Sequence, residues 1–301
     1  MPKDKHKVKI ARTPGLPRNK TMADVVDKYV LYQLSVQEPE HEAAFFDRIY
    51  EERHGRKPRV LREDFCGTFA VCCEWVKLGE ERLAVGVDLD PEPLEWGKAH
   101  NLTKVPEARR GQIELRLDDV RTNGQPRADI LAAQNFSFWI FKTRQEVIDY
   151  FRIARDNLAE GGLMVIDMMG GGECYEEEHE DVRSIGGYDK AVKHRDEKPP
   201  CKIGKFKYVW EQHRFNPITH DASFYIHFRF KDRSHWPRAF EYHWRFWTIP
   251  EVREMLAEAG FKESIVYWEN EDEDADERDA WQPAEQAPSD PSWIAYIVGV
   301  G

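Results

Sequence analysis

The sequence predicts an α/β protein built on an open, mostly parallel and doubly wound sheet. Between residues 59 and 167, short β-branched apolar runs alternate with segments of helical periodicity, which is typical of βαβ units. After residue 172 the pattern changes to alternating, aromatic-rich runs, which indicate an antiparallel β subdomain inserted into the parallel sheet. After residue 248 a helix and two strands complete the first pattern.

The strands of the parallel part are predicted where apolar runs are short and flanked by turn residues. They span 59–63, 83–88, 113–117, 128–134 and 163–168. The helices between them are predicted at 70–77, 92–102 and 144–158, and the last carries an apolar stripe at helical spacing. Gly161 and Gly162 are predicted to end that helix as left-handed caps.

The segments before the first strand are predicted to form a tail and a lid. Residues 1–20 are rich in lysine, arginine, proline and glycine, so we expect a flexible basic tail. Residues 21–58 are predicted to be helical with a break at Pro39, and to lie across the binding edge of the sheet. Tyr32 and Gln37 are the candidate lid contacts with a ligand, and packing on the helix surface is their alternative role.

The main domain is predicted to comprise 59–172 and 248–301, and the inserted substrate subdomain 173–247. Inserted strands are predicted at 205–215, 223–231 and 240–247. The main domain ends with a helix at 250–259 and strands at 261–268 and 293–300. The acidic run 269–279 between the last two strands is predicted to be a solvated loop.

Composition narrows the classes of function. The 301 residues are 41% hydrophobic and 33% charged, which is enough apolar content for a sizeable core. A net charge of -11 disfavours nucleic acid as a partner, because gripping a phosphate backbone requires positive charge. No apolar stretch reaches the roughly 20 residues of a membrane span, so we expect a cytoplasmic protein. The five cysteines are odd in number and lack metal-ligand spacing, so neither a metal site nor a disulfide framework is expected.

Acidic residues stand at the carboxyl ends of three successive predicted strands, where open α/β sheets bind ligands. Glu63 precedes a turn in which Gly67 lets a ligand approach the backbone closely. Asp88 ends the second strand, where a carboxylate can accept both hydroxyls of a ribose. Asp119, with Asp118 beside it, can accept from an exocyclic adenine amine, while the following amide can donate to a ring nitrogen. The pattern therefore predicts a nucleoside-containing ligand.

These residues resemble the class I S-adenosylmethionine-dependent methyltransferases, a superfamily with a Rossmann-like, seven-stranded sheet. Residues 63–69 resemble its motif I, but Phe65 and Phe69 replace the outer two of three glycines. Residues 86–90 resemble motif II, and 117–120 the motif that contacts adenine. The turns at 158–163 and 256–261 resemble those before the fifth and sixth strands, so the resemblance covers 59–167 and 250–300. A hydride-transferring dehydrogenase is the nearest rival, but its fingerprint requires three glycines.

The resemblance implies S-adenosyl-L-methionine as the cofactor and S-adenosyl-L-homocysteine as the product. Glu63 would lie near the methionine amino group, Asp88 on the ribose and Leu89 on the adenine face. The other implied cofactor contacts come from the loops after the first, third and fourth strands: Phe65, Cys66, Gly67, Thr68, Asp118, Asp119, Val120, Gln134 and Asn135.

The methyl acceptor is expected beside the end of the fourth strand, at residues 134–139. Asn135 could orient the acceptor or the methionine end of the cofactor, and a turn role is its alternative. Because the leaving group is already activated, positioning can carry much of the catalysis, while a histidine could remove a proton from the acceptor. His227 and His243 of the inserted strands are the candidates, with structural roles as the alternative. The aromatic inserted strands could instead form a homodimer interface.

Three functions are consistent with this pattern. Methylation of a small molecule is favoured, because the insertion can enclose a pocket and the charge disfavours nucleic acid. Methylation of a nucleic acid or a protein, held by the basic tail, is the second. A non-catalytic module that binds S-adenosylmethionine is the third, because Phe65 and Phe69 depart from motif I.

Overall fold

The computed structural model describes residues 16, 19–186, 203–270 and 280–301. The chain forms two compact units. The insert unit comprises the described residues up to Gln37 with Glu177–Phe215 and Ala222–His243. The parallel-sheet unit comprises Glu38–Glu176, Asn216–Asp221 and Trp244–Gly301. The predicted basic tail, except for residues 16, 19 and 20, and most of the acidic run lie outside the described residues.

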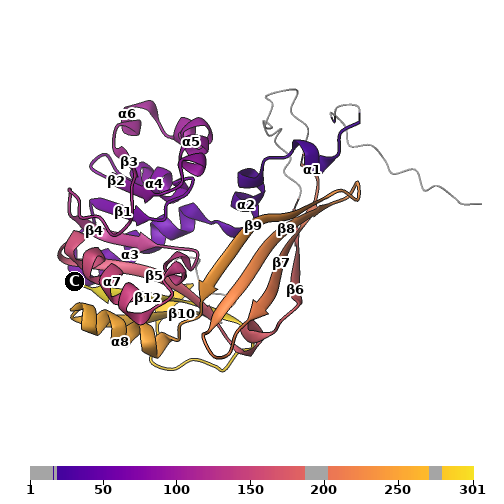
Figure 1. Cartoon of the computed structure of the whole chain (residues 1–301). Coiled ribbons are helices and arrows are strands. Elements are labelled where there is room, and N and C mark those ends of the chain that lie inside the picture. Colours follow the sequence, from indigo (N-terminus) through magenta and orange to yellow (C-terminus); the bar gives the residue numbers. More distant parts are fainter. Residues whose placement is uncertain (1–15, 17–18, 187–202, 271–279) are drawn as a thin grey trace, which may run out of the picture. The chain divides into compact units, whose positions relative to one another are not determined.

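The parallel-sheet unit contains an eight-stranded sheet (Figure 1). Its strands are β1 (Val60–Asp64), β2 (Leu83–Asp88), β3 (Ile113–Leu117), β4 (Ala128–Ala133), β5 (Leu158–Gly170), β10 (Glu263–Glu269), β11 (Trp281–Pro283) and β12 (Trp293–Val300). Their order is β11-β10-β12-β5-β4-β1-β2-β3, and β1 to β5 are parallel. The predicted α/β class is confirmed. The chain leaves β1 toward β2 on one side and β4 lies on the other, so the switch in strand order falls between β1 and β4.

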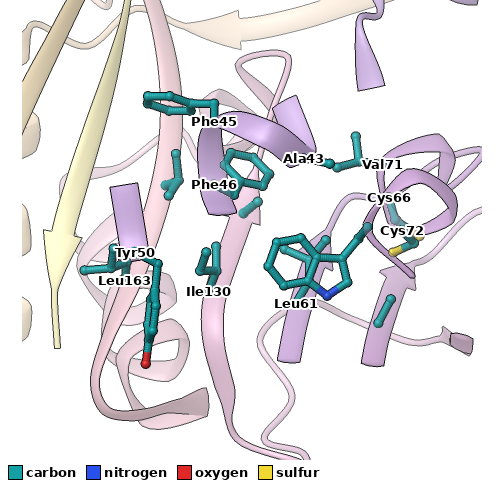
Figure 2. Packing of buried hydrophobic residues seen from close by; sticks show 14 of the residues in the cluster. Ala43, Phe45, Phe46, Tyr50, Leu61, Cys66, Val71, Cys72, Ile130 and Leu163 are labelled. Carbon is teal, nitrogen blue, oxygen red and sulfur yellow. The ribbon is translucent and has the colours of Figure 1, made fainter. Parts of the chain in front are cut away.

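Helices cover both faces of this sheet. The face of Leu61, Ile130 and Leu163 packs against α3 (Pro39–His54) and α4 (Ala70–Trp75), as Figure 2 shows for Phe46 and Tyr50 of α3. The opposite face carries Asp64 and contacts α7 (Arg144–Asn157), which packs against α8 (Ile249–Ala259). The remaining helices are short: α5 (Pro91–His100), α6 (Glu107–Arg110) and four 3-10 turns at Val76–Leu78, Leu102–Lys104, Ser137–Ile140 and Gly172–Tyr175. None of the described helices is long and apolar enough to cross a membrane.

The insert unit is a four-stranded sheet with two N-terminal helices. Its strands, in spatial order, are β6 (His179–Ile185), β7 (Phe206–Phe215), β8 (Asp221–Phe230) and β9 (His235–Arg245). The predicted antiparallel pairing is confirmed for β7 and β8, and β6 also pairs antiparallel with β7. Helices α1 (Met22–Val25) and α2 (Lys28–Val36) belong to the core of this unit, where Leu31 packs with Phe206 and Phe228. Many of the aromatic rings on these strands are therefore buried by contacts within the chain, and these rings are not exposed for a homodimer interface.

The predicted elements and the observed ones differ at identifiable points. The sequence did not predict β6, because its charged residues give an edge strand little apolar periodicity. The predicted helix at 144–158 ends at Asn157, and Gly161 and Gly162 lie inside β5. A Cβ on Gly162 would lie 2.9 Å from the carbonyl oxygen of Ala128, where the β4–β5 register shifts. Gly162 thus permits the close approach of the two strands, and Gly161 has the predicted left-handed φ, at 70°. Neither glycine caps the helix, so that part of the prediction was wrong.

Candidate functional site

The turn after β1 has a left-handed backbone at three alternate residues, two of which are not glycine. Phe65, Gly67 and Phe69 have φ of 57°, 50° and 46°, the left-handed conformation that glycine normally supplies. The Gly67 N–H donates to Asp88 Oδ2 at 2.7 Å, and the Thr68 carbonyl accepts from Asn101 Nδ2 at 2.9 Å. A Cβ on Gly67 would meet no atom within 4 Å, so the space above this residue is open. The loop is therefore built to leave room beside its backbone.

The two phenylalanines offset their backbone strain by packing. A left-handed non-glycine residue costs about 1–2 kcal/mol. Phe69 is fully buried, and its ring lies against Gly97 of α5. Phe65 makes ring contacts with Phe141 and Tyr150 at centroid distances of 6.2 and 5.8 Å. Burial of an aromatic ring stabilises by about 1.5–3 kcal/mol, which offsets the strain.

We predict that Gly97→Ala destabilises this loop. The added Cβ would lie 2.5 Å from the carbonyl oxygen of Thr68 and 2.9 Å from a ring carbon of Phe69, and the Thr68 backbone cannot rotate away. Overpacking of this kind costs about 1–3 kcal/mol of unfolding free energy, measurable by urea denaturation. Gly111→Ala is the matched control, because its φ is -69° and its Cβ would meet nothing within 4 Å. An equal loss in both variants would contradict the prediction.

Asp88 ties two loops together at the end of β2. Its Oδ2 accepts from Gly67 N, and its Oδ1 accepts from Asp90 N at 2.9 Å. Each carboxylate oxygen retains a second lone pair for a ligand hydroxyl. Leu89 beside it is 65% exposed, so ordinary core packing does not explain this side chain. Asp88 and Leu89 thus present a polar and an apolar contact side by side.

A buried arginine of β1 holds the loop after β3 through hydrogen bonds to its backbone. Arg62 of β1 is 3% exposed and donates to the carbonyl oxygens of Val120 at 2.7 Å and Thr122 at 3.1 Å. Its Nε also donates to Asp64 Oδ1 at 2.6 Å, and Asp64 accepts from the hydroxyl of Tyr150 at 3.1 Å. The backbone N–H of Val120 donates to no other described residue. The loop therefore presents an available donor in a fixed position.

Asp119 differs from its predicted role. The guanidinium and backbone N–H of Arg121 occupy both of its carboxylate oxygens, at 2.7–3.0 Å, and Arg121 holds the pKa of Asp119 below its ordinary value. Asp118 is exposed, and its Oδ1 accepts from Asp119 N and from the Thr122 hydroxyl. Arg62, Val87, Asp118 and Thr122 help to line a cavity of about 250 Å³. Of the two carboxylates, Asp118 is therefore the more available to a ligand.

Glu63 lies on the face of the sheet that α3 and α4 cover. Its Oε2 accepts from the Cys72 N–H in the first turn of α4 at 3.0 Å. Burial raises its pKa to about 7, and the negative charge of Asp88 adds to the rise. In the same way Asp119 raises the pKa of Asp64, after burial. Glu63 thus interacts with Asp88, whereas the interaction with Asp119 comes from Asp64 on the opposite face of β1. All of these acids stand at or just after the carboxyl ends of the neighbouring parallel strands β1, β2 and β3.

The loop after β4 is anchored by a second buried carboxylate. Asn135 and Phe136 have φ of 58° and 56°, and their N–H groups donate to the two oxygens of Asp167, each at 2.8 Å. Burial raises the pKa of Asp167 to about 7 against these hydrogen bonds, which lower it. The side-chain amide of Asn135 bonds to no other described residue, whereas Gln134 donates to the Val165 carbonyl. Of these two predicted contacts, Asn135 therefore has the side chain that is more available to a ligand.

Aromatic side chains gather beside this loop within the parallel-sheet unit. Trp139 packs against Phe136, Trp244 and Phe246 at centroid distances of 5.5, 6.0 and 4.7 Å. Trp139 is fully buried, and its indole Nε1 has no hydrogen-bond partner among the described residues. These rings form a rigid apolar support for the loop that carries Asn135.

Three histidines of the insert unit lie around one tyrosine. The rings of His213, His227 and His243 lie 5.2, 6.3 and 6.5 Å from that of Tyr225. His227 Nε2 contacts Glu211 Oε2 at 2.7 Å, and its Nδ1 accepts from the Arg238 N–H at 3.0 Å. Both ring nitrogens are therefore engaged, which favours a structural role for His227. His243 Nδ1 contacts the Ser223 hydroxyl at 3.1 Å.

The predicted lid segment divides between the two units. Tyr32 of α2 packs on Phe240 of β9 at 4.8 Å, inside the insert unit. Gln37 ends this part of the chain, and its Oε1 is buried without a hydrogen-bond partner among the described residues. Helix α3 begins at Pro39, as the sequence predicts for the break, and packs on the parallel sheet.

Solved structures share the fold of this chain. An amino pentose methyltransferase from Micromonospora echinaspora, involved in calicheamicin biosynthesis, aligns with a TM-score of 0.62 at 14% identity, over 90% of this chain and 95% of that chain. A sugar N-methyltransferase from a Streptoalloteichus species gives 0.59 at 17% identity, over 96% and 98%. An S-adenosylmethionine-dependent methyltransferase from Clostridium acetobutylicum gives 0.61 at 12% identity, over 90% and 96%. The chain has a methyltransferase fold. No protein-family model and no curated protein matches the sequence.

Within this methyltransferase fold, the sequence did not indicate the roles of Arg62 and Asp167. Both lie inside strands, where alternation predicts only the face to which each side chain points. A charged residue in an otherwise apolar strand is the one signal that could have indicated them. Among the residues that the structure describes, no three His, Cys, Asp or Glu side chains are placed to hold a metal ion.

Proposed function

We propose that the protein is an S-adenosyl-L-methionine-dependent methyltransferase acting on a small molecule. The observation that carries this proposal is the convergence of Glu63, Asp88 and the Val120 loop at the carboxyl ends of β1, β2 and β3. These ends adjoin the switch in strand order, which is where open α/β sheets bind ligands. The shared methyltransferase fold supports the same ligand class.

The residues at this edge fit the cofactor. The open space above Gly67 admits a ligand beside the backbone, and Asp88 offers its remaining lone pairs to ribose hydroxyls. Leu89, exposed in the free protein, would pack on the adenine face. The Val120 N–H would donate to an adenine ring nitrogen, and Asp118 would accept from the adenine amine. Asp119 is engaged by Arg121, so we assign the amine to Asp118 instead.

When bound, the cofactor supplies a methyl group on a sulfonium that is already activated for displacement. The protein's own contribution is then chiefly position. Asp167 fixes the loop that carries Asn135, whose free amide can orient an acceptor. The buried rings around Trp139 exclude water beside that loop.

A small-molecule acceptor is supported by the structural neighbours, which include an amino pentose and a sugar N-methyltransferase. The alternative of a non-catalytic module rested on Phe65 and Phe69, whose backbone takes the left-handed conformation that glycine favours. The open space above Gly67 supports cofactor binding despite these replacements. The reason for considering a nucleic acid or protein acceptor was the basic tail, which lies almost entirely outside the described residues. A labelled-methyl screen against amines, metabolite extracts, RNA and protein would separate these classes of acceptor.

Asp88→Ala is expected to weaken S-adenosylhomocysteine binding. The variant loses a charged partner of the ribose hydroxyls and the anchor of Gly67, so the loss should be about 1–3 kcal/mol, or roughly 5- to 150-fold in Kd, by calorimetry. Glu95→Ala, an exposed change on the neighbouring helix α5, is the control. Unchanged affinity in Asp88→Ala would exclude the ribose role. Failure of the unmodified protein to bind S-adenosylmethionine and S-adenosylhomocysteine would exclude the proposed function.

A further inference from the structure

The insert unit contains a cavity of about 530 Å³ that the proposed function does not use. It lies beside the hairpin of β8 and β9, drawn in orange in Figure 1, and every residue that lines it belongs to this unit. Small-molecule sites have volumes of about 300–1,000 Å³, so the cavity is large enough for a small organic ligand. Its charged and titratable lining residues are Glu180, His227, Arg229, Arg233 and His235. The lining therefore contains one carboxylate against two guanidinium groups.

Arg229 stands at a position where an uncompensated cation is unfavourable. It lies directly opposite Lys207 of β7, so the two side chains are on the same face of the sheet. Like charges directly opposite each other on antiparallel strands destabilise a sheet. The Arg229 Nη2 donates to both carboxylate oxygens of Glu180, at 2.6 and 2.8 Å, while its Nε and Nη1 donate to no other described residue. Arg229 therefore keeps donors for a further anion, and its side chain is 43% exposed.

The turn between β8 and β9 holds Arg233 in a strained conformation. Arg233 has a φ of 65°, in the left-handed region that non-glycine residues rarely adopt. Hydrogen bonds to α1 fix the turn on both sides of this residue. Asp232 accepts from the Met22 N–H at 2.8 Å, and the Ser234 hydroxyl accepts from the Ala23 N–H at 3.2 Å. Such strain persists only where the surroundings enforce it, and it is concentrated at ligand-binding positions.

Arg233 and His235 supply donors that the protein itself leaves unused. Both side chains are exposed, and neither has a hydrogen bond or an ion pair to any residue that the structure describes. His227 differs, because both of its ring nitrogens are engaged, one of them by the N–H of Arg238. Arg238 also has a left-handed φ, at 46°, so strained residues lie at both ends of the segment 233–238. The cavity thus joins a fixed wall at His227 to unengaged donors on its rim.

We propose that this cavity binds the phosphate group of a small organic molecule, an inference that does not depend on the proposed function. A phosphate monoester carries about 1.5 to 2 negative charges at neutral pH and three acceptor oxygens. The guanidinium groups of Arg229 and Arg233 can each donate to these oxygens, and the His235 ring supplies a further donor. A single carboxylate has one charge and two oxygens, so it matches one arginine rather than two.

Inorganic phosphate is the probe for this site. Calorimetry on the full chain measures its Kd, with chloride adjusted so that the ionic strength stays constant. Arg233→Gln and Arg229→Gln should each weaken phosphate binding about 10-fold or more, because each removes charge-assisted hydrogen bonds. Arg214→Gln, an exposed exchange on β7 outside the cavity, is the matched control for the loss of one positive charge. Because salt screens distant charges, it should change the Kd by less than about twofold.

Two further exchanges of Arg233 separate binding from folding. Arg233→Gly removes the guanidinium but suits the left-handed φ, so it should unfold at the same or a higher urea concentration than the unmodified protein. Its phosphate affinity should nevertheless fall as far as that of Arg233→Gln. Arg233→Lys keeps the charge and loses the planar fork, so its Kd should lie between those of the unmodified protein and Arg233→Gln.

Two organic anions test the class of ligand. Glycerol phosphate should bind at least as tightly as inorganic phosphate, and acetate about 10-fold more weakly. Equal affinity for acetate and phosphate would overturn the assignment to a phosphate group. Absence of phosphate binding, or an equal loss of affinity in Arg214→Gln and Arg233→Gln, would overturn the site itself.

Discussion

Arg62→Met should destabilise the protein by about 3–5 kcal/mol, the largest effect we expect from a single exchange outside the apolar core. Arg62 and Asp64 are 3% and 1% exposed and form an ion pair at 2.6 Å. Removal of the guanidinium leaves the Asp64 carboxylate buried with only the Tyr150 hydroxyl. It also removes the donors to the Val120 and Thr122 carbonyls, so the loop after β3 should loosen and S-adenosylhomocysteine should bind more weakly. Urea denaturation and calorimetry measure the two effects.

A double exchange separates the contribution of the ion pair to the free energy of unfolding from the contribution of side-chain packing. Arg62→Met with Asp64→Leu removes both charges, and such replacements are often close to neutral. The double variant should therefore be more stable than Arg62→Met alone, which is a coupling measurable in a double-mutant cycle. Arg59→Met, an exposed exchange just before β1, is the control for the loss of an arginine. A loss below about 1 kcal/mol in Arg62→Met would show that the buried pair does not hold this loop.

The sequence was sufficient for the parts of the fold that have strong periodicity. Strands β2 and β12 begin and end where the apolar runs predict, because buried central strands are continuous apolar segments. Strand β3 at the edge of the sheet also has its predicted bounds, because its apolar residues alternate with charged ones. The charged edge strand β6 has no such signal. No sequence signal indicated that the N-terminal segment divides between the two units. Periodicity shows that a helix has an apolar face, but it does not show which surface covers that face.

The sequence predicts where the candidate site lies, but it does not predict the hydrogen-bond and ion-pair partners of the residues in it. Three acids at strand ends indicated the edge of the sheet, since topology alone brings the carboxyl ends of parallel strands together. Whether each carboxylate is available depends on neighbours that the strand pattern does not reveal: Arg121 engages Asp119, whereas Asp118 stays exposed. The Phe65 and Phe69 replacements suggested a different loop. In the structure both residues adopt the left-handed backbone that glycine favours and their rings pack on neighbouring side chains, which the strand pattern does not reveal.

The loop after β4 gives the second large effect that we predict. Asp167→Ala removes two hydrogen bonds to a carboxylate, each worth about 1.5–3 kcal/mol, and leaves the N–H groups of Asn135 and Phe136 without acceptors. Both residues sit at left-handed φ, a conformation that persists only where the surroundings enforce it. We therefore expect a loss of about 3 kcal/mol or more in unfolding free energy.

Methyl transfer should suffer more than stability does in this variant. Displacement of the Asn135 loop by about 1 Å is enough to lower a position-dependent rate roughly 100-fold. Asp167→Asn keeps one oxygen acceptor for the two N–H donors, so its unfolding free energy and its rate should lie between those of Asp167→Ala and the unmodified protein. Asp149→Ala, an exposed change on α7, controls for the loss of a carboxylate. Single-turnover rates at saturating cofactor separate positioning from cofactor binding, and a rate unchanged in folded Asp167→Ala would show that this loop does not position the acceptor.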